Sequence, residues 1–535
     1  MFDRDLLISQ LKNNKNWDAI IIGGGATGLG IALDCATRGY KTLLLEQVDF
    51  AKGTSSRSTK LVHGGVRYLA QGNIDLVKEA LYERGLMLKN ASHLVLNQSF
   101  IIPNYNFFDI LKYTVGLKLY DFLAGKLSFG KSTRISKSKT INRLSTIKHD
   151  KLKGGVVYHD GQFDDARLAV NMAQSAIENG ATVLNHFKVN QLLKDDNGEI
   201  NGVVAVDTET NQEYSVQAKV VINATGVFTD EVLKMDNRQA KDIVRPSQGV
   251  HLVVDKSFLP ENDAIMIPKT DDGRVLFLVP WHNRVLIGTT DTLLDSHNLE
   301  PKPLDKEIDF IISTTNRYLT KNIEKKDVLS IFAGLRPLAA PKDKSETTKE
   351  ISRSHKIIVS DSGLITITGG KWTTYRRMAQ DTVNKAILLG KLSYKSCKTK
   401  DVLIHGANGQ TNQNTHLYIY GTDKKEIEKL ISETPELGKK LHPRLEFLKA
   451  EAVWAVRNEM ARTIEDVLAR RVRILFLDAK AAIEIAPDIA TILASELNKD
   501  DAWKTQQIAE FTMMAKQYVL QDDAKTQNQE FAKIV

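Results

Sequence analysis

Three glycines near the start of the chain have the spacing of a nucleotide-binding loop. Gly23, Gly25 and Gly28 form a G-x-G-x-x-G motif, and Glu46 follows 18 residues after the last of them. The first glycine of such a motif permits a tight turn, the second lets backbone approach a pyrophosphate, and the third lets a helix pack closely on a strand. A carboxylate at the position of Glu46 can bind ribose hydroxyls. The motif therefore predicts a dinucleotide site.

The sequence around this motif has the pattern of the βαβ unit that must position it. We expect a strand over 18–22, a helix over 26–38 and a second strand over 41–46. The start of the helix would offer free N–H groups and its positive dipole end to the pyrophosphate. A glycine triplet alone also occurs as a plain turn in unrelated α/β domains. Here the two strands and the acid are in register with it, which favours the nucleotide site.

Two glycine turns further along favour FAD over NAD. Ala224 and Gly226 close a predicted strand over 220–226, and Gly369 and Gly370 close another over 364–368, ahead of a helical stretch over 373–390. A helix start there would direct positive dipole at a reduced flavin, which carries negative charge. Each turn taken alone is more often an ordinary strand-to-helix connection. The order strand, glycines, helix occurs three times, and this repetition indicates FAD.

The bulk properties limit the class of protein. The chain has 535 residues, more than the roughly 250–300 at which a single core stops growing, so we expect two or three domains. Lys and Arg exceed Asp and Glu by 73 − 65 = 8, which suits anionic substrates, anionic lipid or nucleic acid. Two cysteines are too few for a disulfide scaffold, a four-cysteine zinc site or an iron–sulfur cluster, and we expect no metal. We also expect no signal peptide and no membrane-spanning helix.

Two further blocks are more specific than the glycine triplet. They read STKLVHGG at 58–65 and GGKWTTYR at 369–376. With the segments 20–28, 53–69, 164–168, 223–226, 288–291, 334–338 and 462–471, they span nearly the whole chain in order. Together they resemble the FAD-dependent glycerol-3-phosphate dehydrogenases of the aerobic, membrane-associated type. The extra cysteines of the anaerobic type and the EF-hand loops of the mitochondrial relatives do not occur in this sequence.

The resemblance implies an α/β and α+β fold in three parts. We expect a Rossmann-like FAD-binding domain of the glutathione-reductase and amino-acid-oxidase type, a β-rich substrate domain that caps it, and a C-terminal helical domain. The predicted FAD-binding domain is discontinuous, over 17–90, 155–242 and 334–392. The cap takes 91–154 and 243–333. A polar stretch over 393–416 is predicted as a linker, and 417–535 as the helical domain.

The expected cofactor site combines the glycine turns with a hydroxyl-rich loop at 54–59. Such a loop can hydrogen-bond the pyrophosphate or the flavin, although composition alone favours a flexible polar loop. The predicted FAD-binding residues are Gly23, Gly25, Gly28, Glu46, Ser56, Ser58, Thr59, His63, Gly65, Val189, Ala224, Gly226, Gly370, Lys371 and Thr373.

The resemblance implies glycerol 3-phosphate as substrate and dihydroxyacetone phosphate as product. The phosphate needs cations, and arginine suits it because the planar guanidinium donates two parallel hydrogen bonds. A single arginine is more often a solvated surface charge. Arg336 and Lys371, however, stand beside Gly or Pro at strand ends, which favours the site. The family's phosphate and hydroxyl pocket corresponds to Arg67, Tyr68, Arg336, Arg353 and Lys371, and for Arg353 the two interpretations are balanced.

Two histidines are candidates for the base that accepts the C2 hydroxyl proton as hydride leaves for flavin N5. His251 opens a predicted strand, and His63 precedes two glycines. Histidine suits the role because its pKa lies near working pH. Either could instead only hydrogen-bond flavin or backbone. We favour His251, with His63 holding the flavin or sharing the role, and the sequence leaves the choice open.

An apolar stripe followed by a basic run suggests contact with lipid. Residues 126–153 contain nine Lys or Arg and one acid, and they follow an apolar series at helical spacing, namely Phe108, Leu111, Val115, Leu119 and Phe122. A helix lying in an anionic lipid interface has this pattern, and a core-facing stripe before a solvated loop explains it equally well. The resemblance favours peripheral attachment to the cytoplasmic face of the cell membrane, with quinone as acceptor.

Other partners are less defined by the sequence. No zinc finger or RNA-binding signature accompanies the basic run, so we expect no nucleic acid. The oligomeric state is open, and a homodimer is one arrangement that the sequence allows.

Three other functions compete with this prediction. A glycerol-3-phosphate oxidase would use oxygen in place of quinone. A related FAD-dependent amine or amino-acid oxidase would need a carboxylate clamp and an apolar pocket, which does not explain the set of cations. A non-catalytic flavin-binding module would keep the glycine turns but has no use for Arg336 and Lys371.

Overall fold

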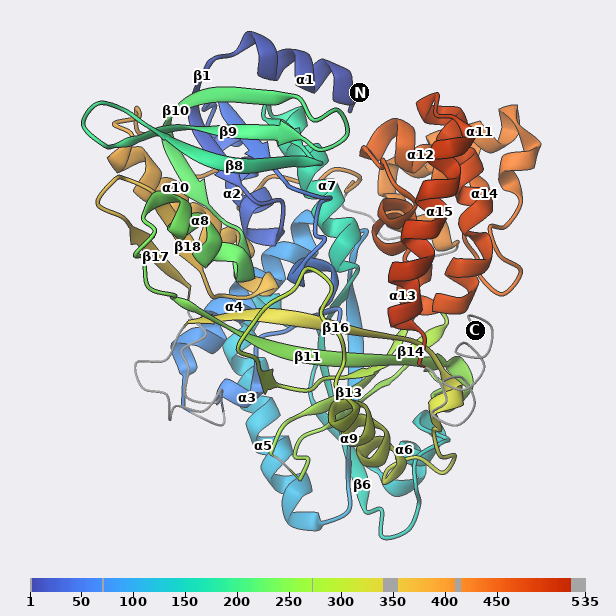
Figure 1. Cartoon of the computed structure of the whole chain (residues 1–535). Helices are drawn as coiled ribbons and strands as arrows, with labels where there is room; N and C mark the ends of the chain where they lie inside the picture. The colour runs from blue at the N-terminus through green and yellow to red at the C-terminus, as the bar shows by residue number, and fades with distance from the viewer. Residues whose placement is uncertain (1, 70–71, 272, 340–354, 409–414, 521–535) are drawn as a thin grey trace.

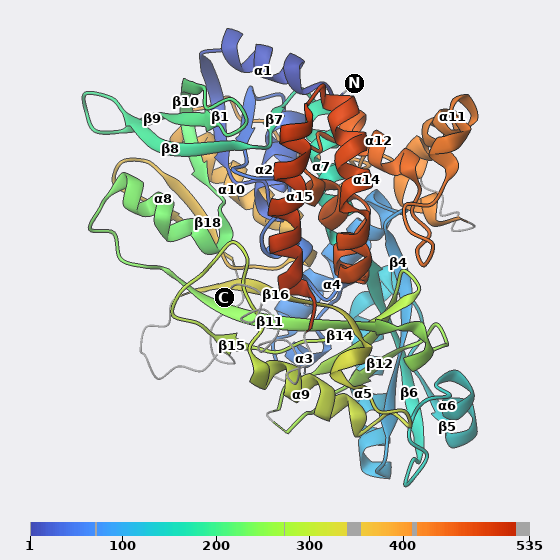
Figure 2. The same cartoon turned by 45° about the vertical axis from the view of Figure 1, so that its right-hand side comes forward.

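Two β-sheets and a group of C-terminal helices make up the computed structural model, which describes residues 2–69, 72–271, 273–339, 355–408 and 415–520. In Figure 1 the sheet that contains the N-terminal strand lies above the second sheet, and the C-terminal helices, drawn in orange and red, stand beside it. Figure 2 shows the same arrangement turned by 45° about the vertical axis, with the C-terminal helices brought forward. The fold confirms the α/β and α+β class with a C-terminal helical domain.

The first sheet has the strand order β17-β18-β10-β1-β2-β7, with β8 and β9 attached through β10. Its central strands pair in parallel, and β1 is apolar and buried over most of its length, as expected for a strand covered on both faces. The strands are β1 (Asn16–Ile22), β2 (Thr42–Leu45), β7 (Thr182–Leu184), β8 (Phe187–Lys194), β9 (Ile200–Asp207), β10 (Glu213–Asn223), β17 (Lys356–Val359) and β18 (Ile365–Thr368).

Helices α2 (Ala26–Thr37), α7 (Asp165–Glu178) and α10 (Tyr375–Leu389) pack together against this sheet. The βαβ unit formed by β1, α2 and β2 agrees with the predicted elements to within two residues at each end. The turn after β18 and the turn after β10 lie at the carboxyl edge of the parallel strands, next to the turn after β1. This edge is where ligands bind in such sheets.

The second sheet has the order β15-β11-β14-β13-β12-β4-β6-β3, with β16 paired to β11 and β5 to β6. Its longest pairing joins β11 and β16 in antiparallel register. The strands are β3 (Leu61–Val62), β4 (Val95–Asn104), β5 (Thr133–Ser136), β6 (Gly154–Phe163), β11 (Val244–Asp255), β12 (Ala264–Ile267), β13 (Leu276–Trp281), β14 (Arg284–Gly288), β15 (Thr292–Leu293) and β16 (Val328–Ala339).

Three groups of helices cover this second sheet. Helix α9 (Asp305–Asn316) packs on apolar residues of β11 and β16, and α5 (Phe107–Ala124) packs through Ile110 and Leu117 on β4, β6 and β12. The C-terminal helices bury Trp281 and Phe332 on the face opposite to that covered by α9. These helices are α11 (Lys424–Glu433), α12 (Lys449–Glu459), a π-helical turn (Asp466–Arg471), α13 (Ile474–Leu477), α14 (Ala479–Leu497) and α15 (Asp501–Ala515).

The remaining helices are α1 (Arg4–Asn13), α3 (Val66–Leu69), α4 (Ile74–Asn90), α6 (Lys137–Arg143) and α8 (Thr229–Asp236). The sheets divide differently from the predicted domain boundaries. Strands β3 and β6 and the end of β16 belong to the second sheet, although the prediction assigned 61–62, 155–163 and 334–339 to the FAD-binding domain. The predicted boundaries at 155 and 334 thus fall inside β6 and β16.

Candidate active site

The glycine loop after β1 is shaped so that side chains would not fit. Gly23 has φ +107°, and a Cβ at Gly28 would lie 1.9 Å from the carbonyl oxygen of Gly23. The N-terminus of α2 can therefore approach β1 closely, as the motif predicted. Ser55 adds a second contact there, because its Oγ accepts a hydrogen bond of 2.9 Å from the Ala26 N–H.

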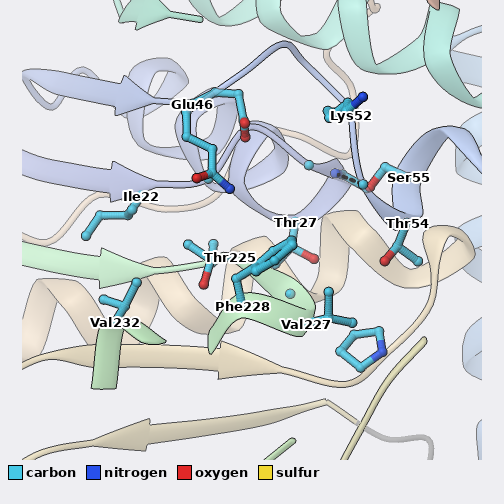
Figure 3. A pocket seen from close by; sticks show the side chains of 18 of the residues that line it. Ile22, Thr27, Glu46, Lys52, Thr54, Ser55, Thr225, Val227, Phe228 and Val232 are labelled. Atoms are coloured by element: carbon cyan, nitrogen blue, oxygen red, sulfur yellow. Dashed lines mark hydrogen bonds between the residues drawn. The ribbon is translucent and has the colours of Figure 1, made fainter. Parts of the chain in front are cut away.

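A cavity of about 200 Å³, here called the nucleotide cavity, opens beside this loop. Figure 3 shows Ile22, Glu46, Ser55 and Thr225 arranged around it. The Glu46 carboxylate accepts hydrogen bonds from the N–H groups of Gly24 (2.6 Å) and Val48 (2.9 Å), and burial raises its pKa. Of the predicted cofactor residues, this cavity is lined by Gly23, Gly25, Glu46, Val189, Ala224, Gly226, Gly370 and Lys371.

Two more cavities continue from the first. A central cavity of about 240 Å³ shares Thr54, Pro337 and residues 369–372 with the nucleotide cavity. A distal cavity of about 220 Å³ shares Thr59, Leu61, His63, Phe277 and Arg336 with the central one. The three form a series from the glycine loop into the second sheet. A long dinucleotide fits such a series better than a mononucleotide does.

Arg336 lies where the central and distal cavities meet. It stands on β16, and Pro337 and Gly334 beside it adjoin the central cavity. Its guanidinium donates to the Thr290 carbonyl (3.1 Å) and the Thr289 hydroxyl (3.3 Å), and one nitrogen is 3.3 Å from the Asp291 carboxylate. The side chain remains 29% exposed. These contacts hold the planar group in place while leaving part of it open to a ligand.

Lys371 follows the Gly369–Gly370 turn and lines both the nucleotide and the central cavity. Gly370 has φ +75°, and an added Cβ would lie 2.3 Å from the Met378 sulfur. This turn therefore requires glycine. It brings a lysine to the edge of the cavity that also contains Arg336.

His251 and His63 both border the central cavity. His251 is buried, its Nε2 lies 2.8 Å from Thr59 Oγ1, and burial together with the charges of Lys60 and Arg336 lowers its pKa well below the usual value. The imidazole is thus neutral at pH 7. His63 also borders the distal cavity, and its carbonyl accepts a hydrogen bond of 3.5 Å from the Thr373 hydroxyl.

The other predicted residues have varied positions. Ser58 and Thr59 line the central cavity, Gly65 lines the distal one, and Thr373 lines the central one. Ser56 lines none of these three cavities: it is buried, and its carbonyl accepts hydrogen bonds from Lys60 and Arg473, whereas Thr54 and Ser55 border the nucleotide cavity. Arg67 and Tyr68 lie in α3, next to Val66 of the distal cavity. Arg353 lies outside the described residues.

Sequence reasoning missed several polar residues of the distal cavity. Thr289, Thr290 and Asp291 line it from the segment after β14, and Arg274 lines it from the segment before β13. The 288–291 block matches the resembled family, but its neutral hydroxyls give no chemical signal of a binding role. Apolar side chains make up another wall, contributed by Val66, Phe100, Met266, Val275 and Phe277.

Comparison with known proteins agrees with this geometry. A family model of FAD-dependent oxidoreductases matches residues 18–376, and a model of the C-terminal domain of alpha-glycerophosphate oxidase matches 365–504. The mitochondrial glycerol-3-phosphate dehydrogenase of Rattus norvegicus is 40% identical over 543 residues, covering 94% of this chain and 74% of the rat protein. The human protein of the same name is also 40% identical, over 540 residues, with the same coverage.

The chain belongs to the FAD-dependent glycerol-3-phosphate dehydrogenase family. A structure of the glycerol-3-phosphate dehydrogenase from Bacillus halodurans, complexed with FAD, superimposes with a TM-score of 0.79 at 30% identity, covering 97% of this chain and 99% of the other. The L-alpha-glycerophosphate oxidase of Mycoplasma pneumoniae matches with a TM-score of 0.53 at 18% identity over 72% of this chain, which shows the shared fold alone. The cofactor of the family is FAD, and the glycine cradle with its series of cavities fits that dinucleotide.

Proposed function

We propose that this protein oxidises glycerol 3-phosphate at C2 to dihydroxyacetone phosphate. The observation that carries the proposal is the meeting of Arg336, Lys371 and the neutral His251 in cavities that continue directly from the dinucleotide cradle. Membership of the glycerol-3-phosphate dehydrogenase family supports the same substrate. Bound FAD would supply the oxidant that takes hydride from C2.

In this proposal the phosphate binds to the two cations at the cavity edge. Arg336 is pre-oriented by Thr289, Thr290 and Asp291, so that less freedom is lost when it binds a phosphate bidentately. Arg67, Tyr68 and Arg353 would add to this pocket. The C2 hydroxyl would then lie toward His251 and His63, and a neutral imidazole can accept its proton. The amino-acid-oxidase alternative has less support, because a pair of cations matches the charge of a substrate phosphate better than that of the single carboxylate of an amino acid.

The first test is anaerobic mixing of the flavin-loaded protein with glycerol 3-phosphate. We expect loss of the flavin absorbance and formation of dihydroxyacetone phosphate in equal amount. Glycerol without phosphate should leave the flavin oxidised at the same concentration. Bleaching by amino acids and not by glycerol 3-phosphate would instead assign an amino-acid oxidase, and no bleaching by either would leave the non-catalytic module.

We further propose attachment to an anionic membrane surface through α5. The apolar stripe predicted on this helix points outward: Phe108 is 82% and Phe122 80% exposed, with Leu111, Val115 and Leu119 also exposed. Lys112 and Lys118 are exposed on the same helix, and the basic segment after it exposes Lys131, Arg134, Lys137 and Lys139. The helix projects from the end of the molecule opposite the first sheet in Figures 1 and 2. Within the described part of the chain, no helix has the length and apolar character needed to cross a bilayer.

This surface has the two features of an interfacial helix, namely an apolar face and flanking cations. Sedimentation with vesicles tests it. Phe108→Ser with Phe122→Ser should reduce binding to anionic vesicles by about tenfold or more, because each buried phenylalanine contributes roughly 1.5–3 kcal/mol. Met513→Ser, which changes an exposed residue of α15, is the control. Equal binding to neutral and anionic vesicles at low salt would contradict the part assigned to the cations.

We also propose quinone as the electron acceptor at the inner face of the cell membrane. The apolar wall of the distal cavity, with Phe100 and Met266, belongs to the cluster on which Ile110 and Leu117 of α5 pack. A lipid-soluble acceptor would therefore have a short route from the membrane surface. Reoxidation of the reduced flavin by a short-chain quinone should be faster than by oxygen at equal concentration. The reverse order would favour a glycerol-3-phosphate oxidase.

A further inference from the structure

His251 is almost shut off from the cavities that it adjoins. The residue is 2% exposed, and its ring is stacked on Phe332, with centroids 5.0 Å apart. Gly288 lies so close to the ring that an added Cβ would be 2.3 Å from it. Among the described residues Nδ1 has no hydrogen-bond partner, whereas Nε2 is 2.8 Å from Thr59 Oγ1. The hydroxyl of Thr59 is thus the polar group through which the ring meets the site.

Thr59 borders both the central and the distal cavity, as do His63 and Arg336. Its two neighbours in sequence are fixed to one buried carboxylate. Ser58 Oγ donates to Asp165 at 2.7 Å, and the Lys60 ammonium donates to the same oxygen at 2.7 Å. Arg473 binds the other oxygen of Asp165 at 3.1 Å. The backbone on either side of Thr59 is therefore held, which keeps its hydroxyl between His251 and the place proposed for the substrate.

We propose that Thr59 is a catalytic residue that relays the proton of the C2 hydroxyl to His251. The inference rests on the proposed oxidation of glycerol 3-phosphate. The substrate hydroxyl gives its proton to Thr59 Oγ1 while the Thr59 proton passes to His251 Nε2. Bound FAD would accept the C2 hydrogen with its bonding electrons, and the C2–O single bond would become a carbonyl. Two electrons leave as hydride, one proton ends on His251, and Thr59 is regenerated.

The relay fixes the protonation state of the histidine. Nε2 must accept the Thr59 hydrogen bond, so the ring proton is on Nδ1 before the reaction. Burial, and then the positive charges of Lys60 and Arg336 near the ring, lower the pKa of His251, so that it starts neutral. Phe332 stacks on one face of the ring and Gly288 packs close to it, so the Thr59 hydroxyl is the polar contact through which the gained proton would return to the cavity.

Two simpler roles have to be separated from the relay. Thr59 could only orient His251, which then takes the proton itself, or His63 could be the base. The variants that separate them are Thr59→Val, which keeps the shape without the hydroxyl, Thr59→Ser, which keeps the hydroxyl, His251→Gln, the double variant, and His63→Asn. FAD content, measured from the protein-bound absorbance, reports whether each variant is folded around its cofactor.

The main measurement is the anaerobic rate of flavin bleaching at saturating glycerol 3-phosphate. Loss of a proton-transfer group costs about 10²–10⁴-fold. We expect Thr59→Val and His251→Gln to slow bleaching by at least about 100-fold, each with little change in the substrate concentration for half-saturation. The double variant should be no slower than either, and Thr59→Ser should remain within about tenfold of the wild type. The relay would be overturned if flavin bleaching were much faster in Thr59→Val than in His251→Gln. It would also be overturned if His63→Asn were the only variant with a large loss of bleaching rate.

A second readout does not depend on turnover. The ¹⁵N chemical shifts of labelled histidine, assigned by His251→Gln, report which ring nitrogen carries the proton. The relay predicts protonation at Nδ1 in the wild type and a shift of the Nε2 signal in Thr59→Val. Protonation at Nε2 in the wild type would overturn it. If the wild type holds FAD but is not bleached by glycerol 3-phosphate, the substrate proposal fails, whereas the nitrogen shifts still decide whether Thr59 donates to His251.

Discussion

At the scale of single residues, Arg336 provides the most direct test of the phosphate site. Its guanidinium is oriented by neighbours yet 29% exposed, and a charge-assisted hydrogen bond contributes roughly 1.5–3 kcal/mol. Arg336→Ala should therefore raise the KM for glycerol 3-phosphate by about 10- to 150-fold and leave the FAD content unchanged. Steady-state kinetics with an artificial electron acceptor would measure this. Arg457→Ala, which breaks a surface pair with Glu496, is the matched control, and an unchanged KM in Arg336→Ala would remove Arg336 from the site.

The sequence predicted residues of the site where the chemistry of a single side chain was distinctive. Charged or glycine-flanked positions such as Arg336, Lys371 and Gly370 border the cavities, and their binding roles are proposals. Neutral hydroxyls such as Thr289 gave no such signal. The hydrogen bond between Thr59 and His251 joins residues 192 positions apart. Their contact depends on how distant segments of the chain fold together, which no local sequence pattern predicts.

At the scale of elements, the close packing of α2 on β1 is what Gly28 permits. A Cβ there would lie 1.9 Å from the Gly23 carbonyl oxygen, so Gly28→Ala must displace α2, whose N-terminus would face the pyrophosphate of bound FAD. We expect the variant to purify with less than about a tenth of the wild-type FAD, since a displacement that costs over 1.4 kcal/mol of binding reduces affinity tenfold. Gly116→Ala in α5 meets open space and should keep its FAD. Full flavin content in Gly28→Ala would contradict the close-packing explanation.

Elements were predictable where one segment carries its own pattern. The unit β1–α2–β2 follows from contiguous strand, glycine and helix signals within 18–46. The spacing of apolar residues in α5 predicted an apolar stripe along the helix. It did not predict whether the stripe faces the core or the solvent, because both arrangements produce the same sequence pattern. The sequence did not predict that β6 and β16 belong to the second sheet, because the strands with which they pair, β4 and β11, lie far away in sequence.

At the scale of the whole molecule, buried ion pairs attach the C-terminal helices to the rest. Arg471 binds Asp49 at 2.7 Å, Arg473 binds Asp165 at 3.1 Å, and Arg167 binds Glu459. Asp49 lies in the loop after β2, and Asp165 is the first residue of α7. The cations that hold Asp49 keep its pKa low. Because a buried charge without its partner is costly, these helices and the cofactor region should unfold together.

A histidine at the base of the C-terminal part makes this attachment dependent on pH. His405 donates from Nδ1 to Glu178 of α7 (2.7 Å) and from Nε2 to Asp423 before α11 (2.8 Å), which requires the imidazolium. The two carboxylates raise its pKa to about 9. A raised folded-state pKa stabilises the protein fully below the unfolded value of about 6.5, and the contribution is lost as pH rises through about 9.

His405→Gln should therefore lower the stability by about 1–2 kcal/mol at pH 6, a value reduced because Glu178 is half exposed. The difference between variant and wild type should shrink between pH 7 and pH 10. Urea unfolding of the FAD-loaded protein at pH 6, 8 and 10 measures it, with the exposed His149→Gln as the control. A difference that stays constant across this range would mean that His405 contributes by packing, because only the charged form donates to both carboxylates at once.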